Sequence, residues 1–127
     1  VNAWIKGPRA TAEDFQRGLA MMENQGWHVT RYRPPWGMVN AASLRQARQR
    51  GLLLVLWNVM AEDWRGYSNS YEITEKLLSR VKGGSVICLH DAGGDPGAPE
   101  HTLQALELAI PILQKRGYVF TRLGEQV

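Results

Sequence analysis

Cysteine is scarce in this sequence of 127 residues, which contains only Cys88. A single cysteine excludes a disulfide within the chain, so the cysteine content does not indicate a redox compartment. Long apolar runs are also absent, and no stretch approaches the about 18 residues that a membrane-spanning helix requires. No signal peptide is visible, but the chain begins at Val1 and not at a methionine. We therefore expect a piece of a longer protein, without a membrane span.

Runs of like charge are missing as well. The 15 Lys and Arg residues and 12 Asp and Glu residues give a formal net charge of +3, and the basic residues are scattered. A nucleic-acid-binding arm is therefore not expected, because such arms concentrate their charge. The length and the 44% share of hydrophobic residues fit one domain, or part of one, with a buried core.

A unit of helix, glycine and strand is repeated four times along the chain. We expect helices within residues 11–26, 40–51, 70–84 and 99–117, and strands within residues 27–33, 52–59, 85–90 and 118–123. Thr11 and Asn40 are the expected N-caps of the first two helices. The strand at 52–59 is apolar enough to be buried on both faces. The last helix is expected to face the core with Leu103, Leu106, Ile110 and Leu113.

This alternation predicts an α/β fold with parallel strands. Four strands are too few to close a barrel, so the chain by itself leaves a strand of buried type at an edge of the sheet. Natural proteins avoid such edges. We therefore expect missing residues of the same domain, or another chain, to cover that edge.

Chemically reactive side chains follow three successive strands. Two prolines stiffen residues 33–37 behind Arg33, Asp63 and Trp64 follow the second strand, and His90 ends the third. The carboxyl ends of parallel strands meet at one edge of a sheet, where α/β enzymes hold their sites. A cation, a carboxylate, an aromatic ring and an imidazole suit general acid–base chemistry on a ring-shaped substrate.

Three motifs in order resemble those of a known family. "RPPWG" (33–37), "WNVMAEDW" (57–64) and "SVICLHD" (85–91) are similar to the third, fourth and fifth motifs of the polysaccharide deacetylases. This family is carbohydrate esterase family four, the NodB-homology domain. The resemblance covers nearly the whole chain. It implies an α/β fold that is the parallel-stranded portion of a distorted (β/α) barrel, and a hydrolase that uses a divalent metal, usually zinc.

The expected reaction is removal of N-acetyl groups from N-acetylglucosamine-containing glycans, as in chitin or peptidoglycan. The resemblance implies that Arg33 pairs with a catalytic aspartate and keeps it ionised. His90 is the implied general acid, which protonates the leaving amine, and Asp63 orients it. Family members are often exported or wall-associated, and this favours an extracytoplasmic location.

The same resemblance implies the substrate-binding residues. Trp64 would form one wall of the sugar groove and Trp36 another apolar surface, with Pro35 beside it. Cys88 stands where the family commonly has a leucine that lines the pocket for the acetyl methyl group. This departure leaves the shape of the acyl pocket open.

The family's first two motifs, an aspartate pair and a His-x-x-x-His pair, are absent. The three histidines are His28, His90 and His101, and no two have that spacing. We therefore expect residues 1–127 to be a partial domain that lacks the amino-terminal metal-binding part. Without three protein ligands it should not bind the metal tightly and should be inactive alone.

Other interpretations stay open. The chain would be a degenerate, non-catalytic glycan-binding module if the upstream ligands were missing altogether, or an unrelated doubly wound α/β domain if the clustering were chance. The His-Asp doublet at 90–91 is also found in metal phosphohydrolases, but these are all-helical. "AGGDPGAP" (92–99) lacks the lysine of a phosphate loop and is expected to be a mobile surface loop. His28 is expected to be structural and His101 solvated.

Overall fold

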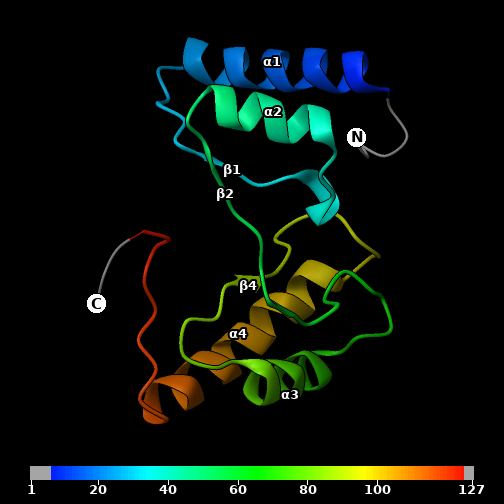
Figure 1. The fold of residues 1–127 in the computed structure, drawn as a ribbon. Coiled ribbons are helices and arrows are strands. Elements are labelled where there is room, and N and C mark those ends of the chain that lie inside the picture. The colour runs from blue at the N-terminus through cyan, green and yellow to red at the C-terminus, as the bar shows by residue number, and fades with distance from the viewer. Residues whose placement is uncertain (1–6, 125–127) are drawn as a thin grey trace. The chain divides into compact units, whose positions relative to one another are not determined.

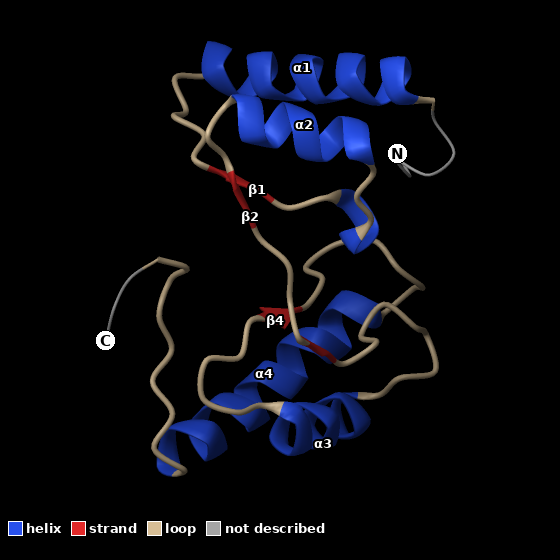
Figure 2. Cartoon of the chain, in the orientation of Figure 1, coloured by secondary structure: helices blue, strands red, loops and turns tan. Residues whose placement is uncertain are grey.

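A computed structural model describes residues 7–124 of the chain. The chain divides into two compact units between Leu56 and Trp57, and each is described here by itself. Helices alternate with short parallel strands in both units (Figures 1 and 2). The expected α/β class with parallel strands is confirmed.

The first unit packs two helices against a two-stranded parallel sheet. Its elements are α1 (Pro8–Asn24), β1 (Arg31–Tyr32), the 3₁₀ helix η1 (Pro35–Gly37), α2 (Ala41–Gln49) and β2 (Leu53–Leu54). Helices α1 and α2 lie side by side (Figure 1). The ring of Phe15 meets the edge of the Tyr32 ring, with centroids 4.8 Å apart, so α1 also packs on β1.

One of the two expected N-caps is correct. Asn40 caps α2 through a capping box: the Ser43 amide donates to Asn40 Oδ1 at 2.9 Å, and the Asn40 amide donates to Ser43 Oγ at 3.1 Å. The expected cap at Thr11 is wrong. Helix α1 begins earlier, at Pro8, which suits a first turn because it has no amide hydrogen to leave unpaired. The Thr11 hydroxyl instead donates to the Gly7 carbonyl.

The second unit packs two helices over a second parallel pair of strands. Its elements are β3 (Val59–Met60), α3 (Ser70–Arg80), β4 (Ile87–Cys88) and α4 (Ala98–Lys115), and β3 pairs with β4. Helices α3 and α4 pack against each other. The buried core consists of Val59, Ala61, Ile73, Leu77, Val81, Ala105, Ala109 and Leu113.

The buried face of α4 differs in part from the expected one: Leu113 is buried and Leu106 packs on the core as expected, but Leu103 does not. Leu103 is 61% exposed, whereas Thr102, Ala105 and Ala109 are almost fully buried. These small residues follow one another at helical spacing, so α4 can approach α3 closely along this line. The expectation for Leu103 is therefore wrong, and the neighbouring Thr102 is the buried residue.

Two of the expected strands are also different. Residues 52–59 do not form one strand: β2 and β3 are separate, and Leu53 is 63% exposed. Residues 118–123 form no strand among the residues that the structure describes, and Val119 is 68% exposed. A strand needs a hydrogen-bonding neighbour on at least one side, and no described strand pairs with this segment.

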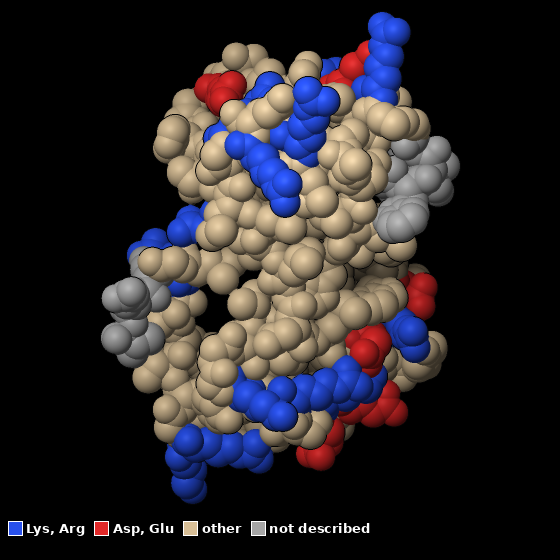
Figure 3. Space-filling view, viewed as in Figure 1, with Lys and Arg blue, Asp and Glu red and all other residues tan. Residues whose placement is uncertain are grey.

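No helix within residues 7–124 has both the length and the hydropathy needed to cross a membrane. Figure 3 shows Lys and Arg at several separate places on the face in view. This distribution agrees with the scatter of basic residues along the sequence.

Candidate active site

Asp63 and His90 meet at the carboxyl ends of β3 and β4. Because these strands run parallel, the residues that follow them lie at the same edge of the pair. The His90 amide donates to Asp63 Oδ2 at 2.7 Å, and His90 Nδ1 lies 3.0 Å from Asp63 Oδ1. The Asp63 side chain has no exposed surface, while that of His90 is 40% exposed. The expected pairing of a carboxylate with an imidazole is present.

This arrangement assigns different tasks to the two ring nitrogens. The carboxylate is an acceptor, so Nδ1 is the nitrogen that carries the hydrogen in the neutral ring. Within residues 57–124, Nε2 of His90 has no hydrogen-bonding partner. Nε2 is therefore the atom that can exchange a proton with a bound molecule, and the half-exposed ring leaves room for one.

Trp64 borders this pair. Its ring meets the His90 ring edge to face, with centroids 5.3 Å apart and planes at 77°. The Arg65 guanidinium lies 5.8 Å from the Trp64 centroid and 5.6 Å from the Tyr67 centroid, and it also donates to the Tyr67 hydroxyl. An aromatic and cationic surface thus adjoins the imidazole.

The glycine-rich loop is attached to the Trp64 loop. Asp95 makes two contacts with it: its amide donates to the Trp64 carbonyl at 3.0 Å, and its carboxylate accepts from the Gly66 amide at 2.7 Å. Gly94 has φ +76°, and a Cβ added there would lie 2.7 Å from the Trp64 carbonyl oxygen. This segment, expected to be a mobile surface loop, is therefore a close packing partner of the aromatic residue.

Glu62, the residue before Asp63, is joined by two ion pairs to helix α3. Its carboxylate lies 2.8 Å from Lys76 and 2.8 Å from Arg80, and these hydrogen bonds hold the pKa of Glu62 below its ordinary value. Glu62 has a positive φ of 52°, which is uncommon for a residue with a side chain. The paired cations hold this unusual turn at the entrance to the site.

The other two histidines lie outside this pair. The expectation that His101 is solvated is wrong, because it is half-buried and its Nδ1 lies 3.0 Å from the Ser68 carbonyl. His28 is exposed and precedes β1, where a structural role was expected within a strand.

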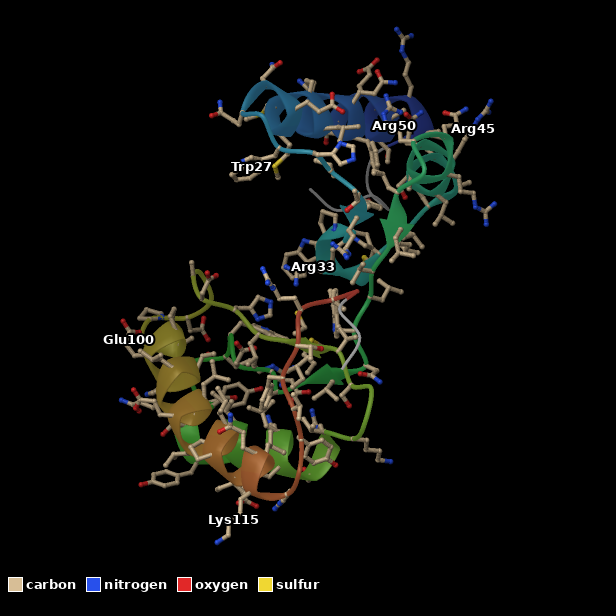
Figure 4. All side chains as sticks on the ribbon, turned by 90° about the vertical axis from the view of Figure 1, so that its left-hand side faces the viewer. Trp27, Arg33, Arg45, Arg50, Glu100 and Lys115 are labelled. Atoms are coloured by element: carbon tan, nitrogen blue, oxygen red, sulfur yellow. The ribbon has the colours of Figure 1, made fainter. Side chains whose placement is uncertain are left out.

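Arg33, Pro35 and Trp36 belong to the first unit. They follow β1, where Figure 4 labels Arg33, and Pro34 between them is buried. The Gly37 amide donates to the Pro34 carbonyl at 3.0 Å, which closes the stiff turn that the two prolines predict. Trp36 is 79% exposed and has a positive φ of 60°.

Part of this segment also lines a cavity of about 470 Å³ within the first unit. Arg33 and Pro35 contribute to its wall, together with Phe15 and Met22 of α1. The roles of Arg33, Pro35 and Trp36 in a site stay predictions.

Cys88 lies at the end of β4 and is buried, with 5% of its surface exposed. Its role in an acyl pocket also stays a prediction. Among the described residues no group of three or more His, Cys, Asp or Glu side chains could hold a metal ion. The described residues therefore do not form a metal centre by themselves.

Sequence reasoning missed Thr102. Its hydroxyl lies 3.1 Å from Asp63 Oδ2, and only 5% of the residue is exposed. The available signal was a polar residue on the small-residue face of a helix, four positions after Ala98. It was not used because Leu103 and the other apolar residues at its spacing were expected to form the buried face of α4.

The sequence has relatives of described activity, although no family model matches it. The peptidoglycan-N-acetylglucosamine deacetylase PgdA of Listeria monocytogenes is 30% identical over 106 residues, which are 84% of this chain and 21% of the relative. A chitooligosaccharide deacetylase of Sinorhizobium fredii is 31% identical over 104 residues, 76% of this chain and 48% of the relative. The chain thus spans less than half the length of these curated relatives.

A solved structure agrees with them. The family 4 carbohydrate esterase of Streptomyces lividans, in complex with acetate, superposes with a TM-score of 0.78 at 25% identity, over 98% of this chain and 61% of that chain. The sequence relatives, the fold and the motifs that contain Asp63 and His90 all indicate the same family. The chain belongs to the polysaccharide deacetylases of carbohydrate esterase family four and has their NodB-like fold.

Proposed function

We propose that the chain is part of a metal-dependent carbohydrate deacetylase, which removes N-acetyl groups from N-acetylglucosamine-containing glycans of the peptidoglycan or chitooligosaccharide type. The relatives are named for these substrates. The observation that carries the proposal is the hydrogen-bonded pair of buried Asp63 and half-exposed His90.

In the proposed reaction His90 is the general acid. Its Nε2 delivers a proton to the amine that leaves as the C–N bond breaks, and Asp63 stabilises the positive charge of the imidazolium before that transfer. Asp63 also keeps the hydrogen of the neutral ring on Nδ1, so that Nε2 faces the substrate with the correct protonation. Trp64, whose ring abuts the imidazole, would form a wall of the sugar groove.

The remaining roles follow the family motifs. Arg33 would pair with a catalytic aspartate that the chain does not contain, and Pro35 and Trp36 would contact the glycan. Cys88 would line the acyl pocket. We propose that residues 1–127 are a partial domain and that the ligands of the divalent metal, in this family usually zinc, belong to its amino-terminal part. This segment alone would then be inactive.

The missing part also has a structural task in this proposal. Leu53 of β2 is 63% exposed, and Leu56, two residues after the end of β2, is 44% exposed. Burial of such side chains is favourable, and an uncovered strand edge invites pairing. The amino-terminal part of the domain, or another chain, would cover them.

A second candidate is a degenerate glycan-binding module of the same fold. It is favoured by the lack of a metal-ligating group within residues 7–124. It would retain Trp36 and Trp64 as glycan contacts without hydrolysis.

One experiment separates the two. Acetate release from an N-acetylglucosamine tetramer is measured with the complete domain, meaning this chain together with the residues that precede it in its protein, with zinc added. Binding of the same tetramer is measured by calorimetry. Acetate release that is lost in His90→Ala supports the deacetylase. Binding without release in the unmodified domain supports the module, and neither binding nor release contradicts both.

A further inference from the structure

We infer that Thr102 is a positioning residue for the acid–base pair: its hydroxyl anchors one oxygen of the Asp63 carboxylate and thereby holds the other oxygen on the imidazole of His90. The geometric part rests on contacts within the second unit. Only its consequence for catalysis rests on the proposed function.

Three donors converge on the Asp63 carboxylate. The His90 amide at 2.7 Å and the Thr102 hydroxyl at 3.1 Å both reach Oδ2, and His90 Nδ1 reaches Oδ1 at 3.0 Å. Oδ2 is therefore held from two sides, by the backbone that follows β4 and by α4. With Oδ2 fixed, rotation of the carboxylate about its Cβ–Cγ bond is prevented, and Oδ1 stays on the imidazole.

Two acceptors lie within hydrogen-bonding distance of the Thr102 hydroxyl. Thr102 Oγ1 lies 3.1 Å from the Ala98 carbonyl, in its own helix, and 3.1 Å from Asp63 Oδ2. It has one hydrogen to donate. An ionised carboxylate accepts more strongly than a peptide carbonyl, so the hydrogen goes to Asp63.

The hydrogen bond from Thr102 matters because the Asp63 carboxylate is buried. Asp63 has no exposed surface, so water cannot replace a lost hydrogen bond to the carboxylate. Thr102 itself is 5% exposed and lies on the line of small residues where α4 meets α3. A valine there has nearly the same shape but offers a methyl group to a buried carboxylate oxygen.

The chain offers a matched control. Thr74 of α3 is also a buried threonine, 6% exposed, and its hydroxyl donates to the Ser70 carbonyl of its own helix. It faces α4 at the Ala105 carbonyl, 3.4 Å away, and its hydrogen bonds do not involve Asp63. Thr74→Val therefore removes a buried hydroxyl between the same two helices without touching the carboxylate.

The test determines which nitrogen of the neutral His90 ring carries the hydrogen. The 127-residue chain, labelled with ¹⁵N, is compared with its Thr102→Val, Thr102→Ser and Thr74→Val variants at a pH where the ring is neutral. The ¹⁵N shifts of the imidazole give the ratio of the Nδ1-protonated to the Nε2-protonated form. We expect Thr102→Val to lower this ratio about threefold to tenfold, as loss of one hydrogen bond does. Thr102→Ser and Thr74→Val should leave it unchanged.

An unchanged ratio in folded Thr102→Val overturns the inference, and so does an equal fall in Thr74→Val. If Thr102→Val does not fold, Thr102→Ala is compared with Thr102→Ser by the same measurement, and equal ratios overturn it. This readout needs no deacetylation, so it stands whether or not the proposed function does. In an active complete domain, Thr102→Val should lower kcat with little change in KM, and Thr102→Ser should restore it.

Discussion

His90 contacts both oxygens of the Asp63 carboxylate, through its backbone amide at 2.7 Å and its ring Nδ1 at 3.0 Å. The two contacts come from one residue, so the Asp63 carboxylate fixes both the backbone that follows β4 and the orientation of the ring. A buried carboxylate held in this way leaves only Nε2 of the imidazole for chemistry.

Asp63→Asn tests the orienting role of the carboxylate. An amide at this position can donate to Nδ1, so the hydrogen of the neutral ring moves to Nε2 and the imidazolium loses its stabilising charge. We expect kcat for deacetylation of an N-acetylglucosamine oligomer to fall about a hundredfold or more in the complete domain. Circular dichroism controls for the fold. A rate near that of the unmodified domain would refute the orienting role.

Arg33→Ala tests the proposed clamp on a catalytic aspartate outside the chain. Loss of the cation should misplace that base and lower kcat about a hundredfold. Arg31→Ala is the matched control, because Arg31 is an exposed arginine of β1, the strand that Arg33 directly follows. Equal activities of the two variants, measured by acetate release, would show that Arg33 has no such role.

Gly94→Ala tests the attachment of the glycine-rich loop to Trp64. Gly93 and Gly94 share a φ of +76°, but only at Gly94 would a Cβ meet the Trp64 backbone, at 2.7 Å. Both alanine variants pay the cost of a left-handed backbone, about 1 kcal/mol. Gly94→Ala should lose about 1–3 kcal/mol more in urea unfolding, because the loops must separate.

The same pair of variants has a local readout. Gly94→Ala should shift the indole signals of Trp64 in a ¹H–¹⁵N spectrum, while Gly93→Ala should leave them in place. Equal stabilities together with equal Trp64 shifts would mean that the loop does not position the ring.

Glu62 gives the second unit a dependence on pH. Hydrogen bonds from Lys76 and Arg80 lower the pKa of Glu62 in the folded chain, so its carboxylate stabilises the fold above the pKa of the unfolded chain. This stabilisation is lost as the pH falls through the folded pKa. The free energy of unfolding should therefore decline as the pH falls below 4.5, the ordinary pKa of a glutamate.

Glu62→Gln removes the titrating group. The variant should be less stable than the unmodified chain at neutral pH, by about 1 kcal/mol or less for a partly exposed ion pair, and the difference should vanish at low pH. Urea unfolding at several pH values measures this. A constant difference across the range would contradict the assignment to Glu62.

Some of the fold could be predicted because its signals are local. Asn40 and Ser43 satisfy each other's backbone amides within one turn, so the sequence alone is sufficient to place the start of α2. The meeting of Asp63 with His90 also follows from a simple rule, since residues after parallel strands share an edge. Family motifs then supplied their roles.

The rest depends on contacts that the sequence does not display. Thr102 reaches Asp63 across 39 positions, because α4 turns its small residues and not Leu103 toward α3. The apolar pattern of the helix fits either face. Likewise residues 118–123 have strand composition, but composition does not supply a neighbouring strand.

The measurement that tests the central claim most directly is acetate release from an N-acetylglucosamine tetramer by the complete domain carrying His90→Ala, beside His101→Ala as a control. His101 is a half-buried histidine of the same unit, bonded to a backbone carbonyl. We predict that His90→Ala lowers kcat about a hundredfold or more and that His101→Ala stays near the unmodified rate. A His90→Ala rate equal to that of the unmodified domain would contradict the assignment of His90 as the general acid.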